Sequence, residues 1–104
     1  IGHERAIIDE FVSLLAIPNV AANQQDILRN VQHLQRLLAQ RNIEAQILQI
    51  PNAPAALFAE IRTPGATRTL MFYAHIDGQP VEPSQWQGSK PFTPVLKDRS
   101  GRVI

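Results

Sequence analysis

One nearly continuous apolar run, residues 69–74 (TLMFYA), constrains the fold of this chain more than any other feature. A run without polar alternation is typical of a strand buried on both faces, as in an α/β sheet covered by helices. The run ends abruptly at His75, Ile76, Asp77 and Gly78. The chain is therefore expected to place an inner strand in an α/β sheet, with polar groups at the carboxyl end of that strand.

Two helices are predicted upstream of this run. Residues 4–16 carry apolar side chains at spacings of three and four, and Pro18 ends the helix because the residue before a proline leaves helical geometry. Residues 24–41 repeat the spacing. Asn23 is the expected N-cap, and Asn42 is expected to end the helix by adopting the left-handed conformation. The stripe expected to be buried in this second helix is Ile27, Val31, Leu34 and Leu38.

Short strands and turns are predicted in the remaining segments. Residues 43–50 and 56–61 have the alternation of strands, and the Pro-rich stretch at 51–54 predicts a turn between them. Asp98, Ser100 and Gly101 have turn chemistry, which predicts a hairpin that pairs residues 95–96 with 103–104.

The composition is that of a globular segment. The 104 residues carry a net charge of +1, with 44% hydrophobic and 18% charged residues, and the basic residues are scattered. Such a balance gives no basic patch of the kind that binds nucleic acid. No apolar run approaches the roughly 18 residues that span a bilayer. The lack of Cys excludes a disulfide framework, a thiolate metal site and a thiol nucleophile within these residues. The length and the apolar pair Val103-Ile104 at the end indicate part of a longer protein.

The strongest candidates for functional residues are His75 and Asp77. Ligands of open α/β sheets bind at the carboxyl ends of strands, which is where this pair lies. Alternate residues on an extended chain point the same way, so both side chains are expected to project to one side while Ile76 faces the core. Neutral imidazole is a zinc ligand, and a nearby carboxylate can fix its tautomer and raise its basicity. Gly78 leaves the backbone free to turn sharply.

Other readings of these residues stay open at this point. A His-x-Asp set alone also fits a hydrogen-bonded surface pair, and one His cannot complete a zinc site, which takes about four ligands. His33 is expected on the solvated face of the second helix, and His3 at a frayed end. Trp86 and Phe92 are expected to hold their proline-rich loop to the core. No serine lies in a Gly-x-Ser-x-Gly elbow, and no Gly-rich phosphate loop is present.

The stretch from Leu70 to Val81 (LMFYAHIDGQPV), continued through Trp86 and Pro91-Phe92 to the turn at 98–101, resembles the first metal-binding segment of the M20 metallopeptidase family. That family includes carnosinase-like dipeptidases, glutamate carboxypeptidases, acetylornithine deacetylase and succinyl-diaminopimelate desuccinylase. Its members show an apolar strand, His-x-Asp, a short stretch ending in Pro, a Trp, then Pro-Phe and a turn. The similarity covers essentially the whole chain. Gly78-Gln79-Pro80 departs from the commoner Val-x-Pro continuation, which leaves the subfamily open.

The resemblance implies that residues 1–104 are the N-terminal part of a three-layer α/β/α zinc-peptidase catalytic domain, truncated before the segment that carries a metal-bridging aspartate. His75 would bind one of two zinc ions in the complete site, where Co²⁺ or Mn²⁺ can suit similar ligands. Asp77 would support the site and assist catalysis. The remaining ligands and a glutamate base would lie outside these residues, and Glu82 is too close to Asp77 in sequence to be that base.

The activity implied for the full-length protein is zinc-dependent hydrolysis of peptide or N-acyl amino acid amide bonds, with this segment inactive alone. The substrate would be a small peptide or an N-acyl amino acid, the full-length protein can be a homodimer, and neither nucleic acid nor a membrane is expected as a partner. Two alternatives accompany this reading. One is an N-acyl amino acid deacylase with the same metal centre. The other is a non-catalytic M20-like interaction module, in which the apolar stripe of the second helix contacts a partner.

Overall fold

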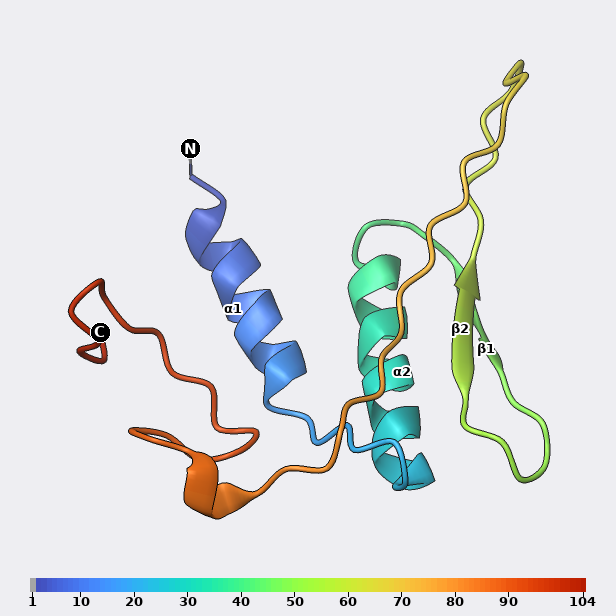
Figure 1. The fold of residues 1–104 in the computed structure, drawn as a ribbon. Helices are drawn as coiled ribbons and strands as arrows, with labels where there is room; N and C mark the ends of the chain where they lie inside the picture. Colours follow the sequence, from blue (N-terminus) through green and yellow to red (C-terminus); the bar gives the residue numbers. More distant parts are fainter. Residues whose placement is uncertain (1) are drawn as a thin grey trace.

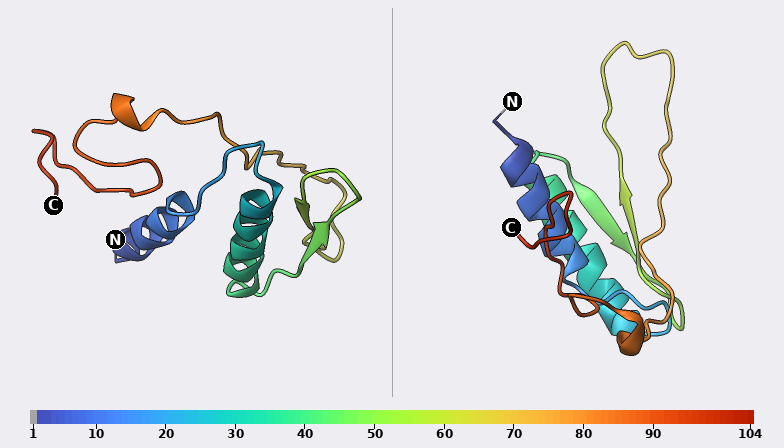
Figure 2. Two further views of the ribbon diagram at one scale, coloured as in Figure 1. Left: turned by 90° about the horizontal axis from the view of Figure 1, so that it is seen from below. Right: turned by 60° about the vertical axis from the view of Figure 1, so that its left-hand side comes forward.

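The computed structural model describes residues 2–104 as a mixed α/β chain. Two helices, α1 (Glu4–Leu15) and α2 (Gln24–Ala39), precede two strands, β1 (Ala45–Leu48) and β2 (Ala56–Ala59). A short 3₁₀ helix, η1 (Pro83–Gln85), interrupts the irregular C-terminal part. Helix α2 lies between α1 and the sheet (Figure 1 and Figure 2). Within residues 2–104, no helix combines the length and the apolar character needed to cross a bilayer.

Local signals fix both ends of α2 as predicted. The side chain of Asn23 accepts a hydrogen bond from the Asp26 N–H at 3.1 Å, which satisfies one of the free donors of the first turn. Asn42 follows the helix with a φ of 58°, the left-handed conformation that asparagine tolerates. The predicted helices are therefore confirmed, with each C-terminus one or two residues earlier than expected.

The strands β1 and β2 form one antiparallel pair. Ala45 pairs with Ala59 and Leu48 pairs with Ala56. The predicted turn at 51–54 joins them, with Asn52 at a φ of 62°. The predicted C-terminal hairpin is present as a single antiparallel bridge between Lys97 and Val103.

The core lies between the sheet side of α2 and the hairpin. Ile27 and Val31 of α2 are buried there together with Ala55, and partly buried residues surround them: Leu28, Ile47, Leu57 and Ile76. Half of the predicted α2 stripe is thus fully buried, whereas Leu34 and Leu38 are partly exposed. The radius of gyration is 16.7 Å, against about 13 Å for a compact domain of this length. The chain is therefore spread around a small core.

The predicted inner strand at 69–74 is absent from the structure. Leu70, Met71, Phe72 and Tyr73 are 82 to 90% exposed, and the segment is extended but unpaired. It forms one side of a long arm that projects past the sheet (Figure 2). The physical reason is the lack of partners: residues 2–104 supply no strand to its backbone N–H and C=O groups and no helix to cover it.

Helix α1 also has an uncovered apolar face. Ile7 and Phe11 are 61% and 59% exposed, and α1 contains no fully buried residue. Polar contacts link it to α2 and its C-terminal turn. Glu10 forms an ion pair with Arg41 at 2.6 Å, and Ser13 hydrogen-bonds to His33 at 3.0 Å.

Candidate functional site

His75 and Asp77 meet on the solvent side of the extended segment that follows the arm. The Nδ1–H of His75 donates to the backbone carbonyl of Asp77 at 2.9 Å and faces the Asp77 carboxylate at 3.2 Å. The two side chains are 73% and 52% exposed. Ile76 points the other way and packs against the core. The alternation predicted for these three residues is confirmed.

The contacts of Nδ1 determine what the His75 ring can do. Both neighbouring oxygens are acceptors, so the geometry assigns the proton of the neutral ring to Nδ1. The lone pair is then on Nε2, which has no hydrogen-bond partner among residues 2–104. An imidazole held in this way is prepared to accept a proton or to bind a metal ion through Nε2.

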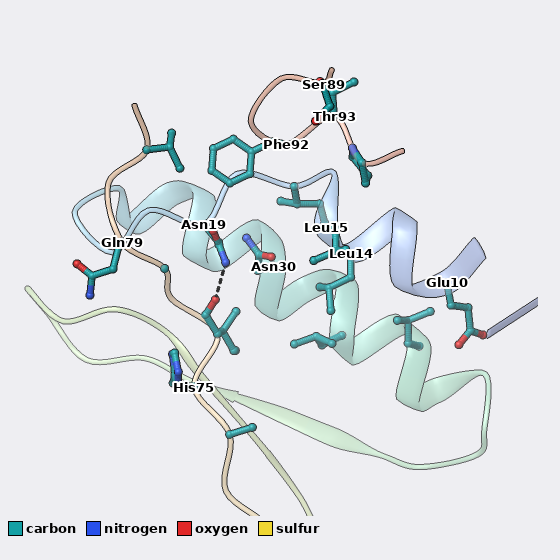
Figure 3. A pocket seen from close by; sticks show the side chains of 18 of the residues that line it. Glu10, Leu14, Leu15, Asn19, Asn30, His75, Gln79, Ser89, Phe92 and Thr93 are labelled. Carbon is teal, nitrogen blue, oxygen red and sulfur yellow. Dashed lines mark hydrogen bonds between the residues drawn. The ribbon is translucent and has the colours of Figure 1, made fainter. Parts of the chain in front are cut away.

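A segment that follows α1 holds the backbone next to this pair. The side-chain amide of Asn19 donates to the Ile76 carbonyl at 3.0 Å, as the dashed line in Figure 3 shows. The Gly78 N–H donates to the Asn19 carbonyl at 2.8 Å, and the Ala21 N–H donates to the Gly78 carbonyl at 3.0 Å. The two backbone bonds make a parallel bridge between Val20 and Gly78. The His75 segment is thus tied to the base of α2.

Gly78 has a different role from the one predicted. Its φ is not positive, so it makes no turn that demands glycine. A Cβ at this position would instead lie 2.9 Å from the side-chain oxygen of Asn19. The glycine permits the close approach of the two segments.

An open cleft of about 1080 Å³ lies beside His75. Apolar residues of both helices form one wall, including Leu14, Leu34 and Leu37, and the C-terminal segment around Phe92 forms another. Figure 3 shows His75 and Glu10 at opposite sides of this cleft. The cleft is large enough for a small ligand, and its walls are mainly apolar, as in many small-molecule sites.

The first carboxylate after Asp77 in the sequence is occupied elsewhere. Glu82 caps η1 by accepting from the N–H and hydroxyl of Ser84, and these bonds lower the pKa of its carboxyl. A lowered pKa does not suit a general base, which works best near the operating pH. Within residues 2–104, no third histidine, aspartate or glutamate joins His75 and Asp77 in a group that could hold a metal ion.

The other residues singled out from the sequence lie apart from this pair. His33 is partly buried between the helices instead of solvated, because its Nε2 contacts the Ser13 hydroxyl. His3 is exposed at the N-cap of α1 and makes no side-chain cap bond. Phe92 lines the cleft with a φ of 56°, and Trp86 is 46% exposed.

Asn19 and Asn30 were missed by the sequence reasoning. Asn30 is 2% exposed, and its amide donates to the Pro18 carbonyl at 2.8 Å and to the Asp26 carbonyl at 2.9 Å. Its spacing was a usable signal, because a residue three after Ile27 and next to Val31 lies on the buried face of α2. Asn19 carried only a weak signal, as a polar residue in a loop.

Comparison of the chain with protein-family models, curated proteins and solved structures finds no match.

Proposed function

We propose that this chain is the N-terminal part of the catalytic domain of a zinc-dependent M20-type hydrolase, and that His75 binds one of two metal ions. The observation that carries the proposal is the state of the His75 ring. It is exposed, its Nδ1–H is held by Asp77, and its Nε2 is open. Metal-ligating histidines nearly always donate their other ring N–H to a carboxylate or a carbonyl, which fixes the tautomer and raises ligand basicity.

The proposed domain is a three-layer α/β/α structure in which residues 69–74 form an inner strand. Elements from outside residues 1–104 would pair with this strand and cover it. The exposed row from Leu70 to Tyr73 supports this part of the proposal, since an apolar segment of this kind is normally buried. The uncovered apolar face of α1 supports it in the same way.

The proposed reaction is hydrolysis of the amide bond of a small peptide or an N-acyl amino acid. The metal ions would supply an activated water and polarise the scissile carbonyl. Asp77 would hold His75 in the tautomer that leaves Nε2 for the metal, and Ile76 would anchor the segment in the core. Zinc is the proposed ion, and Co²⁺ or Mn²⁺ suits similar nitrogen and oxygen ligands. A dipeptidase and an N-acyl amino acid deacylase would use the same centre, and the complete protein could be a homodimer.

Metal analysis of the protein with its natural flanking sequence tests this proposal. We expect wild type to hold two zinc ions per chain, and His75→Ala to lose one of them together with most amidase activity. His33→Ala is the matched control, because that imidazole contacts Ser13 and should leave the metal content unchanged. Equal metal content in wild type and His75→Ala would contradict the role of His75.

A second candidate is a non-catalytic interaction module. One observation favours it: the row of exposed apolar side chains at 70–73. The coding sequence next to this segment separates the two candidates. A Gly-Arg-Gly followed by paired aspartates and then Glu-Glu supports the hydrolase, whereas the absence of these acids supports the module.

A further inference from the structure

Asn19 contacts both peptide groups that flank the Cα of Asp77. Its side-chain amide donates to the carbonyl of the peptide that joins Ile76 to Asp77. Its backbone carbonyl accepts from the N–H of the peptide that joins Asp77 to Gly78. The orientation of both peptide planes is therefore set by one residue, 57 positions away in sequence from Ile76.

The second of these peptides links Asn19 to His75. In a trans peptide the N–H and the C=O lie in one plane and point in opposite directions. When Asn19 holds the Gly78 N–H on one side, the Asp77 carbonyl of the same peptide points to the other side. That carbonyl is the group that accepts the His75 Nδ1–H at 2.9 Å.

Asn19 is itself fixed to the core. The residue before it, Pro18, offers its carbonyl to the buried amide of Asn30 in α2. The residue two positions after it, Ala21, donates to the Gly78 carbonyl. Asn19 is thus held on both sides and can act as a fixed support for the two peptide groups next to the exposed His75 ring.

From this geometry we propose that Asn19 is a positioning residue, which orients the Asp77 carbonyl toward His75 Nδ1 and so keeps Nε2 as the free ligand atom. The role of Asn19 in metal binding rests on the proposed function, whereas the effect of Asn19 on the His75 ring does not. Gly78 is needed for the same arrangement, because a side chain there would collide with the Asn19 amide and displace it from the Ile76 carbonyl.

The test reads the tautomer of His75 from imidazole ¹⁵N chemical shifts, in chelator-treated samples at about pH 8, where a solvated imidazole is neutral. In wild type we expect the Nδ1–H form to predominate. Asn19→Ala keeps the backbone carbonyl that accepts from Gly78 but removes the side-chain bond to the Ile76 carbonyl, which releases one of the two peptide groups that fix Asp77. The His75 bond to the Asp77 carbonyl should then be lost, and the ratio of Nε2–H to Nδ1–H should rise about fivefold, the factor that corresponds to one typical hydrogen bond. Asn19→Asp keeps the size but removes the donor, so it should behave like Asn19→Ala. A residue that only filled space would keep the wild-type ratio in the aspartate variant.

Position 78 provides an independent variant. Gly78→Ala should change the ratio in the same direction, and the double variant Asn19→Ala/Gly78→Ala should change it no more than the larger single effect, because both act through one amide. Asn23→Ala is the structural control: it removes the N-cap of α2 without touching residues 76–78.

Two results would overturn the proposal. One is a wild-type tautomer ratio in the Asn19→Asp and Gly78→Ala variants, whether or not Asn19→Ala folds. The other is a shift in Asn23→Ala as large as that in the Asn19 variants. A failure of the protein to bind zinc would count against the proposed function only, since these samples contain no metal.

Discussion

The buried amide of Asn30 should contribute strongly to the stability of this chain. Its side chain is 2% exposed and donates two hydrogen bonds, to the carbonyls of Pro18 and Asp26. In Asn30→Ala both bonds are lost. The Asp26 carbonyl keeps its helical partner, whereas the Pro18 carbonyl has no replacement donor in a partly buried loop.

The magnitude follows from these two bonds. A typical intramolecular hydrogen bond contributes about 1 kcal/mol net, and a buried acceptor left unpaired costs about 1 to 3 kcal/mol. Alanine is the better helix former by about 0.5 kcal/mol, which offsets part of the loss. We therefore expect Asn30→Ala to lower the free energy of unfolding by about 2 kcal/mol. At an m-value of about 1.5 kcal/mol/M, the urea midpoint should fall by roughly 1.3 M.

Urea unfolding followed by far-UV circular dichroism measures this change. Gln32→Ala is the matched control, because Gln32 is an exposed amide on the same helix and should shift the midpoint little. If the two proteins have equal m-values, a urea midpoint for Asn30→Ala within about 0.3 M of wild type would refute a stabilising role for the Pro18 contact.

Three further predictions concern other parts of the chain. In residues 1–104 alone, Phe72→Ser should change the free energy of unfolding by less than about 0.5 kcal/mol, because the ring is 90% exposed there; a loss of about 3 kcal/mol in urea unfolding would instead show that this segment already buries the ring. The Asp98 carboxyl accepts the Ser100 hydroxyl and the N–H groups of Ser100 and Arg102, and these bonds lower its pKa. Its contribution to stability is therefore present above the ordinary Asp pKa of about 3.9 and is lost as pH falls through the lowered pKa of the folded state. The protection factor of the Arg102 amide, which corrects for the intrinsic pH dependence of exchange, should therefore fall on acidification in wild type but show no such pH step in Asp98→Asn. Purified residues 1–104 alone should hydrolyse no dipeptide or N-acyl amino acid with added zinc, and clear zinc-dependent turnover would contradict the need for outside ligands.

The helices were predictable because their signals act within a turn of the chain. Asn23 caps α2 through a residue three positions away, and Asn42 ends it through its own φ. The hairpin of β1 and β2 also joins segments that are close in sequence, since only residues 49–55 separate the two strands. In contrast, residues 69–74 have strand character but need partner strands, which no local pattern supplies.

The candidate site divides in the same way. The contact between His75 and Asp77 follows from the alternation of an extended chain, so two residues in sequence were enough to predict it. The contact of Asn19 with Ile76 joins positions 57 residues apart, with α2 and the hairpin between them in the sequence. The packing of His33 against Ser13 likewise depends on how α1 lies beside α2, which periodicity alone does not determine.

The exposed row from Leu70 to Tyr73 also has a consequence for handling the chain in solution. With its neighbours Thr69 and Ala74 the row makes six adjacent residues without proline or charge, and in an extended and unpaired state such a segment has the signature of segments that stack into intermolecular sheets. Arg68 precedes the row and Asp77 closely follows it, so charge repulsion between copies is confined to its two ends. Concentrated preparations of residues 1–104 are therefore expected to self-associate through this arm, and Met71→Lys, which places a charge within the row, should reduce that association.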